Sequence, residues 1–150
     1  MYPFWSFLIA LVLAQVLKPV IALVRGKGFQ PKLVFSSGGN PSSHTAAVTS
    51  LTLAVGLREN FDSTLFAVTL AFGLIVAYDA ANVRYYAGKN ISLTKQMLDD
   101  LTSLHIIEKD EPIYFESIKE ILGHKWSEVF FGAIVGLLTA LVIYWIAIRR

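Results

Sequence analysis

Four apolar blocks divide the chain, and they restrict it to helices that lie in a membrane. The blocks comprise residues 3–24, 43–57, 63–83 and 129–148. A helix needs roughly 20 residues to cross the hydrocarbon core, so the second block is short for a full crossing. Hydrophobic residues make up 55% of the 150 residues, and the few charged residues collect between the blocks. The sequence therefore predicts an all-α integral membrane bundle of about four membrane-embedded helices, forming one domain over residues 1–150.

The segments between the blocks indicate how the helices connect. Residues 58–62 form a very short connection, so the second and third blocks should be antiparallel neighbours. The long polar segment 84–128 is expected to hold amphipathic helices, one of them over residues 113–122. Another is predicted from apolar side chains at helical spacing, namely Leu98, Leu101, Leu104 and Ile107.

Basic residues indicate the orientation of the bundle. If all four blocks cross, residues 25–42 and 84–128 lie on one face, which carries Lys27, Lys32, Lys89, Lys95, Lys109 and Lys125. The opposite face carries Arg58, Arg149 and Arg150. The positive-inside rule then places the lysine-rich face in the cytoplasm, with the protein in the plasma (inner) membrane. No basic residue precedes the first apolar block, so we expect that block to be a retained span rather than a signal peptide.

Charge and cysteine content exclude several classes of function. A net charge of +2 does not favour a nucleic-acid partner, and the lack of cysteine excludes disulfides and thiolate chemistry. The histidines could in principle bind a metal together with Asp79 and Glu128. However, the basic residues around them would repel a cation, and no compact HxH or HExxH spacing occurs in the sequence. We therefore predict no metal.

Two histidines lie where apolar blocks begin, and the first of them is His44. Residues 38–41 read Gly-Gly-Asn-Pro, which is typical of a turn, and Ser42 or Ser43 would then cap the second helix. Capping explains these residue types but gives no reason for His44. A helix start with hydroxyl groups and a histidine is suited to binding a phosphate, although a histidine in this place can also be purely structural.

The second histidine, His124, lies four residues before Glu128, which is about one helical turn. Glu128 can accept a hydrogen bond from one ring nitrogen and leave the other nitrogen of His124 as a nucleophile or base. The alternative is a pair that only stabilises the first turn of the fourth helix.

Several cations and one carboxylate are expected on the same face as these histidines. Lys18 and Arg25 are seven residues apart and share a helix face, where they would either bind phosphate or snorkel to the lipid headgroups. Arg84 and Lys119 are further candidate phosphate ligands, whereas Lys125 is interpreted as surface charge. Asp79 would pair with Arg84 or Lys18 and order the pocket, or it would cap the third helix.

The lysine–arginine pair, the first histidine and the histidine–glutamate pair follow one another along the chain as motifs do in the type-2 phosphatidic acid phosphatase superfamily, which this chain resembles. That superfamily includes vanadium haloperoxidases. That superfamily reads K-x6-R-P, then P-S-G-H, then S-R-x5-H-x3-D. Lys18 and Arg25 match its first motif, and the sequence Pro-Ser-Ser-His ending at His44 matches its second. His124 and Glu128 match the end of the third, with glutamate in the aspartate position.

With its departures from these motifs, the chain resembles a divergent branch of the superfamily, described as acid phosphatase/vanadium-dependent haloperoxidase-related. Gly26 replaces the first-motif proline, and Ile118 occupies the position of the superfamily arginine. Lys119 or Arg84 would substitute for that arginine, although a lysine cannot reproduce its bidentate contacts with phosphate.

The resemblance implies a metal-independent hydrolysis of a lipid phosphomonoester or pyrophosphate, without a cofactor. His124 would attack phosphorus to form a phosphohistidine, Glu128 would orient it, and His44 would protonate the leaving alkoxide and then activate water. The phosphoryl oxygens would be held by Lys18, Arg25, Ser42 and Ser43. The expected substrate is a phospholipid or a polyprenyl phosphate.

Two other functions remain open from the sequence. The chain could bind phosphate headgroups without catalysis, or it could be a component of a small transporter. Gly132 and Gly136 form a small-xxx-small pair, which suits a close helix contact within the chain or in a homodimer.

Overall fold

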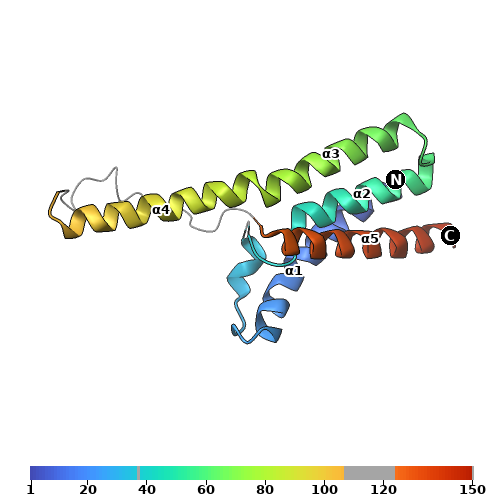
Figure 1. The fold of residues 1–150 in the computed structure, drawn as a ribbon. Coiled ribbons are helices and arrows are strands. Elements are labelled where there is room, and N and C mark those ends of the chain that lie inside the picture. The colour runs from blue at the N-terminus through green and yellow to red at the C-terminus, as the bar shows by residue number, and fades with distance from the viewer. Residues whose placement is uncertain (37, 107–123, 150) are drawn as a thin grey trace.

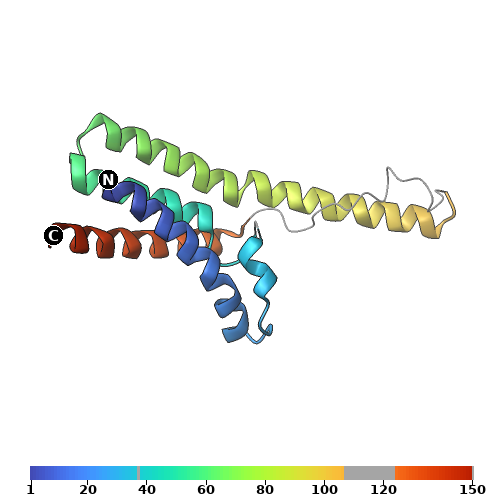
Figure 2. The same ribbon diagram turned by 180° about the vertical axis from the view of Figure 1, so that it is seen from behind.

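The computed structural model describes residues 1–36, 38–106 and 124–149. Within these ranges the chain is helical and contains no β-strand. The elements are α1 (Tyr2–Val24), a short 3-10 helix η1 (Pro31–Phe35), α2 (Ser43–Glu59), α3 (Thr64–Ala81), α4 (Val83–Ser103) and α5 (Trp126–Ile148). Helices α1, α2, α3 and α5 form a bundle with both chain termini at one end, while α4 projects from the other end (Figure 1; Figure 2).

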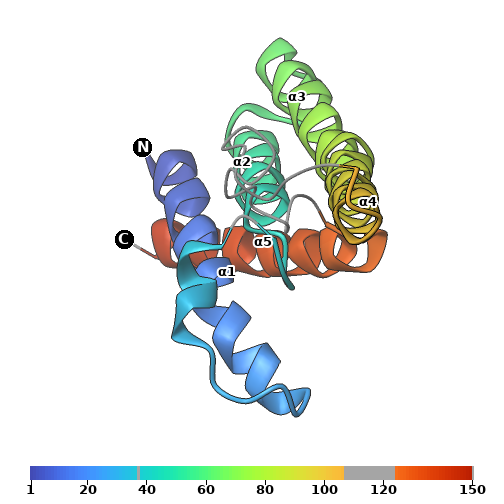
Figure 3. The same cartoon turned by 90° about the vertical axis from the view of Figure 1, so that its left-hand side faces the viewer.

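Helix α2 occupies the centre of the bundle and packs against α1, α3 and α5 (Figure 3). Its buried positions are mostly small or hydroxyl-bearing, including Ala46, Ala47, Ser50 and Ala54. By contrast, the leucine, isoleucine and phenylalanine side chains of α1, α3 and α5 are largely exposed on the outside. Small residues between helices and large apolar residues outside are typical of a bundle surrounded by lipid.

Close contact between α2 and α5 depends on two glycines. A Cβ atom on Gly132 would meet the backbone carbonyl of Ser42, and one on Gly136 would meet the carbonyl of Ala46. The small-xxx-small pair is therefore used within the chain to bring the two helix backbones together.

Hydroxyl groups fix the register of the helices around α2. The Ser6 and Ser50 hydroxyls lie 2.7 Å apart between α1 and α2, and the Ser50 hydroxyl also approaches the Ser6 carbonyl at 3.0 Å. The Tyr2 hydroxyl donates to the carbonyl of Ala54 at 3.0 Å. Interhelical hydrogen bonds of this kind stabilise helix pairs where no water is present.

Within the described residues, three helical segments are long and apolar enough to cross a membrane: Tyr2–Val24, Thr64–Ser103 and Trp126–Ile148. Helix α2 has 17 residues, is less apolar and is enclosed by the other helices. The prediction of a helical membrane bundle is thus confirmed, with three candidate spans around a central fourth helix.

The prediction of a helix in the polar segment after the third block is confirmed in part. Helix α4 begins at Val83, directly after α3, and it includes Leu98 and Leu101, whereas Leu104 follows its last residue and Ile107 lies outside the described residues. The Asn82 amide donates to the carbonyl of Tyr78 at 2.9 Å and continues the helical hydrogen bonding through the junction. No proline occurs between residues 81 and 103 to stop the helix. The short helix predicted over residues 113–122 lies outside the described residues.

Candidate functional site

The candidate residues of four helices meet at one end of the bundle. The second half of α1, the start of α2, the end of α3 and the start of α5 all lie at the end from which α4 projects (Figure 1). This end therefore carries Lys18, His44, Asp79 and the His124–Glu128 pair, as the antiparallel arrangement of the blocks requires.

His124 is buried at the junction of α3 and α5. Its side chain is 1% exposed, and its backbone N–H donates to the carbonyl of Ala80 at 3.0 Å. Nδ1 of the ring lies 3.3 Å from Oε2 of Glu128, which also accepts from the Lys125 amide at 3.1 Å. Nε2 is buried and has no hydrogen-bond partner among the described residues. Because a carboxylate can only accept, this pairing favours a proton on Nδ1 and a free lone pair on Nε2.

The two serines before His44 lie at the start of α2. Ser42 is the N-cap of α2, and its hydroxyl oxygen lies 3.4 Å from the Thr45 amide and 3.0 Å from the Thr45 hydroxyl. The Ser42 amide donates to the carbonyl of Glu128 at 3.0 Å and so ties α2 to α5. Ser43 is 1% exposed. Two cavities lie beside the His124–Glu128 pair. Neither serine is among the residues that line them.

The first of these cavities, here named the histidine cavity, has a volume of about 330 Å³. It is lined by His44, Asp79, Arg84 and His124, together with Ile75, Val76 and Ala80. Nε of Arg84 donates to Oδ2 of Asp79 at 2.8 Å. Asp79 therefore pairs with Arg84, which was one of the alternatives predicted for it. This pair positions the Arg84 guanidinium in the same cavity as the two histidines.

The second cavity, here named the cationic cavity, has a volume of about 440 Å³. Among the described residues five cations line it, from α1, the segment after α1, α4 and the start of α5: Lys18, Arg25, Lys27, Lys89 and Lys125. Lys18 is 1% exposed, and its ammonium donates to the carbonyl of Ser36 at 2.7 Å. Lys18 therefore does not snorkel out of the bundle. Sequence reasoning missed Lys27, Lys89 and Lys125 as lining residues, and the only signal was their nearness to the site motifs.

The His124–Glu128 pair separates the two cavities, since His124 lines the histidine cavity and Glu128 lines the cationic cavity. The structure brings His44, Asp79, Arg84 and His124 together. It does not bring Lys18 and Arg25 into that group. Lys119 lies outside the described residues.

No group of three or more histidine, aspartate or glutamate side chains that could hold a metal ion occurs in the part of the chain that the structure describes. The carboxylates near the histidines are each held by a cation or by a histidine. Asp79 pairs with Arg84, and Glu128 pairs with His124.

Comparison with known proteins agrees with the motifs. The sequence model of the Divergent PAP2 family matches residues 1–139, which include all the candidate site residues. The chain is 40% identical over 147 residues to "Uncharacterized membrane protein YuiD" of Bacillus subtilis (strain 168), an alignment that covers 95% of this chain and 93% of that protein. No solved structure matches the chain. The protein is therefore a membrane protein that belongs to the Divergent PAP2 family.

Proposed function

We propose that this protein is a membrane-embedded, metal-independent lipid phosphatase that acts through a phosphohistidine. The observation that carries the proposal is the environment of His124. Glu128 holds Nδ1, while Nε2 is buried, unpaired among the described residues and part of a ring that lines a cavity with a second histidine and an arginine. A nucleophile that is oriented by a carboxylate and placed beside a general acid is the arrangement that covalent catalysis requires.

In the first step the phosphoryl group of the lipid occupies the histidine cavity. Nε2 of His124 attacks phosphorus, and the bond between phosphorus and the lipid oxygen breaks as the P–N bond forms. Protonated His44 gives its proton to the leaving oxygen, so the lipid departs as an alcohol or as a lipid monophosphate. Glu128 stabilises the positive charge that develops on the His124 ring.

In the second step neutral His44 takes a proton from water, and the water oxygen attacks the phosphohistidine. The P–N bond breaks, inorganic phosphate leaves, and both histidines return to their starting protonation states. Arg84 lines the same cavity and can balance the charge on the phosphoryl oxygens in both steps. It would thus substitute for the superfamily arginine, whose position is occupied by Ile118.

The cationic cavity would raise the local concentration of the anionic substrate. In the part of the chain that the structure describes, its five cations face one carboxylate, Glu128, so the field of these residues attracts phosphate headgroups. We propose that this end of the bundle faces the cytoplasm in the plasma membrane and that the substrate is a phospholipid or a polyprenyl phosphate. Lys18 and Arg25 are proposed as phosphate ligands during approach, and Ser42, Ser43 and Lys119 remain proposed ligands from the motif.

A second candidate function is phosphate-headgroup binding without catalysis. It is favoured by the separation of Lys18 and Arg25 from the nucleophilic nitrogen, because the cations that would bind most tightly lie in the other cavity. In that case the protein would hold an anionic lipid and release no phosphate.

Phosphate release distinguishes the two functions. The native protein, His124→Ala, His44→Ala and His105→Ala are compared on a panel of lipid phosphates in detergent micelles with chelator present. His105 ends the α4 region and is exposed, which makes it the matched control. We expect release by the native protein and His105→Ala, with an acid-labile phosphate label on the protein that His124→Ala does not form. Correctly folded native protein that binds lipid phosphates but releases none would favour headgroup binding.

A further inference from the structure

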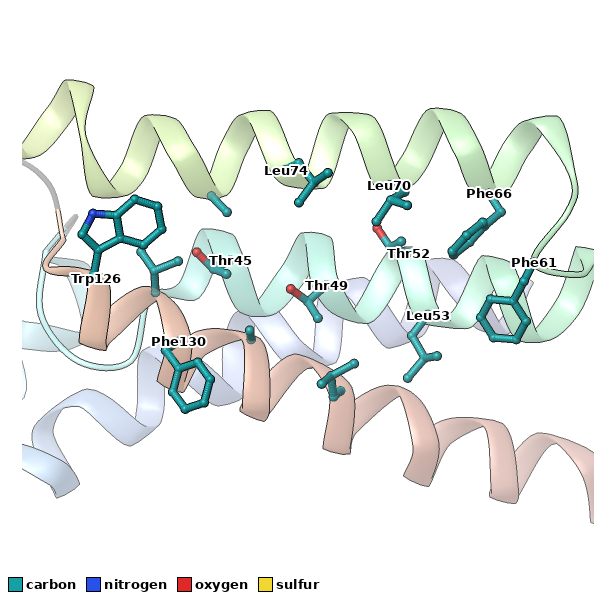
Figure 4. A pocket seen from close by; sticks show the side chains of 15 residues that line it. Thr45, Thr49, Thr52, Leu53, Phe61, Phe66, Leu70, Leu74, Trp126 and Phe130 are labelled. Atoms are coloured by element: carbon teal, nitrogen blue, oxygen red, sulfur yellow. The ribbon is translucent and has the colours of Figure 1, made fainter.

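An apolar groove lies between α3 and α5, with α2 as its floor (Figure 4). Its volume is about 430 Å³. Trp126 stands at one end, Phe61 and Phe66 stand at the other, and Leu74 and Phe130 lie between them on opposite walls (Figure 4). None of the proposed catalytic groups lines this groove, so the proposed chemistry leaves it without a role.

The surface of the groove suits a hydrocarbon. Two of the three threonine hydroxyls of the floor bond within the chain: Thr45 bonds the Ser42 hydroxyl at 3.0 Å, and Thr52 bonds the carbonyl of Val48 at 2.8 Å. The walls carry leucine, phenylalanine and alanine side chains. A polar ligand buried there would lose hydrogen bonds to water without replacing them.

The helices that line the groove give a measure of its length. The lining residues run from Phe66 to Ala77 on α3 and from Trp126 to Leu137 on α5, a separation of eleven residues along the helix in each case. At 1.5 Å per residue these stretches are about 16 Å long, which is roughly half of the 30 Å hydrocarbon core.

One end of the groove adjoins the histidine cavity. Thr45 lines the groove and His44 lines the cavity; on α3, Ala77 lines the groove and Asp79 lines the cavity. Trp126 lies at this end, two positions after His124 (Figure 4). A lipid whose phosphate enters the histidine cavity would therefore have the mouth of the groove beside its first methylene groups.

We infer that this groove binds one hydrocarbon chain of a phosphate-bearing lipid whose headgroup lies at the site, with the chain end directed toward Phe61 and Phe66. The inference rests on the proposed function for the position of the headgroup. It adds a chain-binding site and a limit on chain length, because Phe61 and Phe66 stand at the far end of the groove. Additional chains of the same lipid stay in the bilayer.

The test uses hexadecyl phosphate with a diazirine at the chain end, incorporated into phosphatidylcholine nanodiscs that contain the full chain. After irradiation, labelled peptides are mapped by mass spectrometry. We expect the label near the far end of the groove, on α2 or α5 or in the residues joining α2 to α3. Leu137→Trp fills this part of the groove and should lower the labelling about tenfold, as expected if roughly two methylenes lose their burial. Leu138→Trp is the matched control. Leu138 is the next residue along α5, but its side chain is exposed and does not line the groove.

A second variant, Leu74→Trp, fills the groove from α3. It provides an independent test if Leu137→Trp does not fold. Label spread evenly over the outer faces of α1 and α5, or labelling that neither tryptophan reduces in folded protein, would overturn the inference. Labelling does not require turnover. Groove labelling without phosphate release refutes the phosphatase proposal alone, and phosphate release without groove labelling refutes the groove alone.

Discussion

Oε2 of Glu128 lies 3.3 Å from Nδ1 of His124, and the same oxygen accepts the amide of Lys125 at 3.1 Å. The carboxylate is thus fixed by the backbone at the start of α5 and holds the imidazole in turn. This double contact leaves Nε2 as the ring nitrogen available for chemistry.

Glu128→Gln should lower kcat while leaving KM nearly unchanged. The amide oxygen can still accept from Nδ1, but the substitution removes the negative charge that stabilises a phosphorylated imidazole. We expect a loss between about 100-fold and 10⁴-fold in kcat, the upper value being the size seen when the carboxylate behind the histidine of a serine-protease triad is neutralised. Initial rates measure the change. Glu59→Gln is the control, because Glu59 pairs with Arg58 at the opposite end of α2. Equal rates for native protein and Glu128→Gln would show that the pair only stabilises the helix start.

Gly136→Ala should destabilise the fold. The new Cβ would overlap the carbonyl of Ala46, which belongs to a helix backbone and cannot move independently. Overpacking of this kind costs about 1–3 kcal/mol, measured as a lower thermal midpoint in detergent. Gly73→Ala is the matched control in α3, where the nearest atom, the Thr52 hydroxyl oxygen, would lie 3.3 Å from the added Cβ. A midpoint for Gly136→Ala at or above that of Gly73→Ala would contradict the close α2–α5 contact.

Local sequence patterns determine the helices of this fold, whereas side-chain packing determines the details of the site. The apolar blocks and the short connection after Glu59 were enough to predict the helices and the end at which they bring His44 and His124 together. The burial of Lys18 could not be predicted, because it depends on where the Ser36 carbonyl lies in the folded chain. The division into two cavities likewise follows from side-chain packing around Glu128, for which a single sequence carries no signal.

Ser42→Ala should cost more stability than Ser63→Ala. Both serines cap helices: Ser42 accepts from the Thr45 amide and Ser63 from the Phe66 amide. Loss of a cap costs about 1 kcal/mol. At Ser42 the buried Thr45 hydroxyl would also lose its partner, which adds about 1–3 kcal/mol. Denaturation in detergent compares the two variants, and equal losses would mean that the Thr45 hydroxyl finds another acceptor.

Lys125→Ala should weaken substrate capture at low ionic strength. Lys125 is exposed and lines the cationic cavity, so it contributes to the local field without touching the reacting atoms. We expect KM to rise about threefold to tenfold at low salt, with kcat little changed, and the difference to shrink when salt shortens the range of the field. Lys32→Ala is the control, because Lys32 is equally exposed on η1 but does not line the cavity. An effect on KM that is independent of salt would show that Lys125 acts by stabilising the fold and not by attracting the substrate electrostatically.

Arg84→Lys should reduce the rate although the positive charge is kept. One edge of the Arg84 guanidinium bonds Asp79 through Nε, which leaves its terminal nitrogens available for phosphoryl oxygens in the histidine cavity. A lysine cannot hold the carboxylate and bind phosphate in a bidentate manner at the same time. We expect kcat to fall about 100-fold, the size of effect typical of one preorganised donor at a developing charge. Arg58→Lys is the matched control, since Arg58 also bonds a carboxylate through Nε, that of Glu59, but far from the histidines. If Arg84→Lys retained the full rate, the role of the superfamily arginine would have to be filled from outside the histidine cavity, and Lys119 would become the first residue to test.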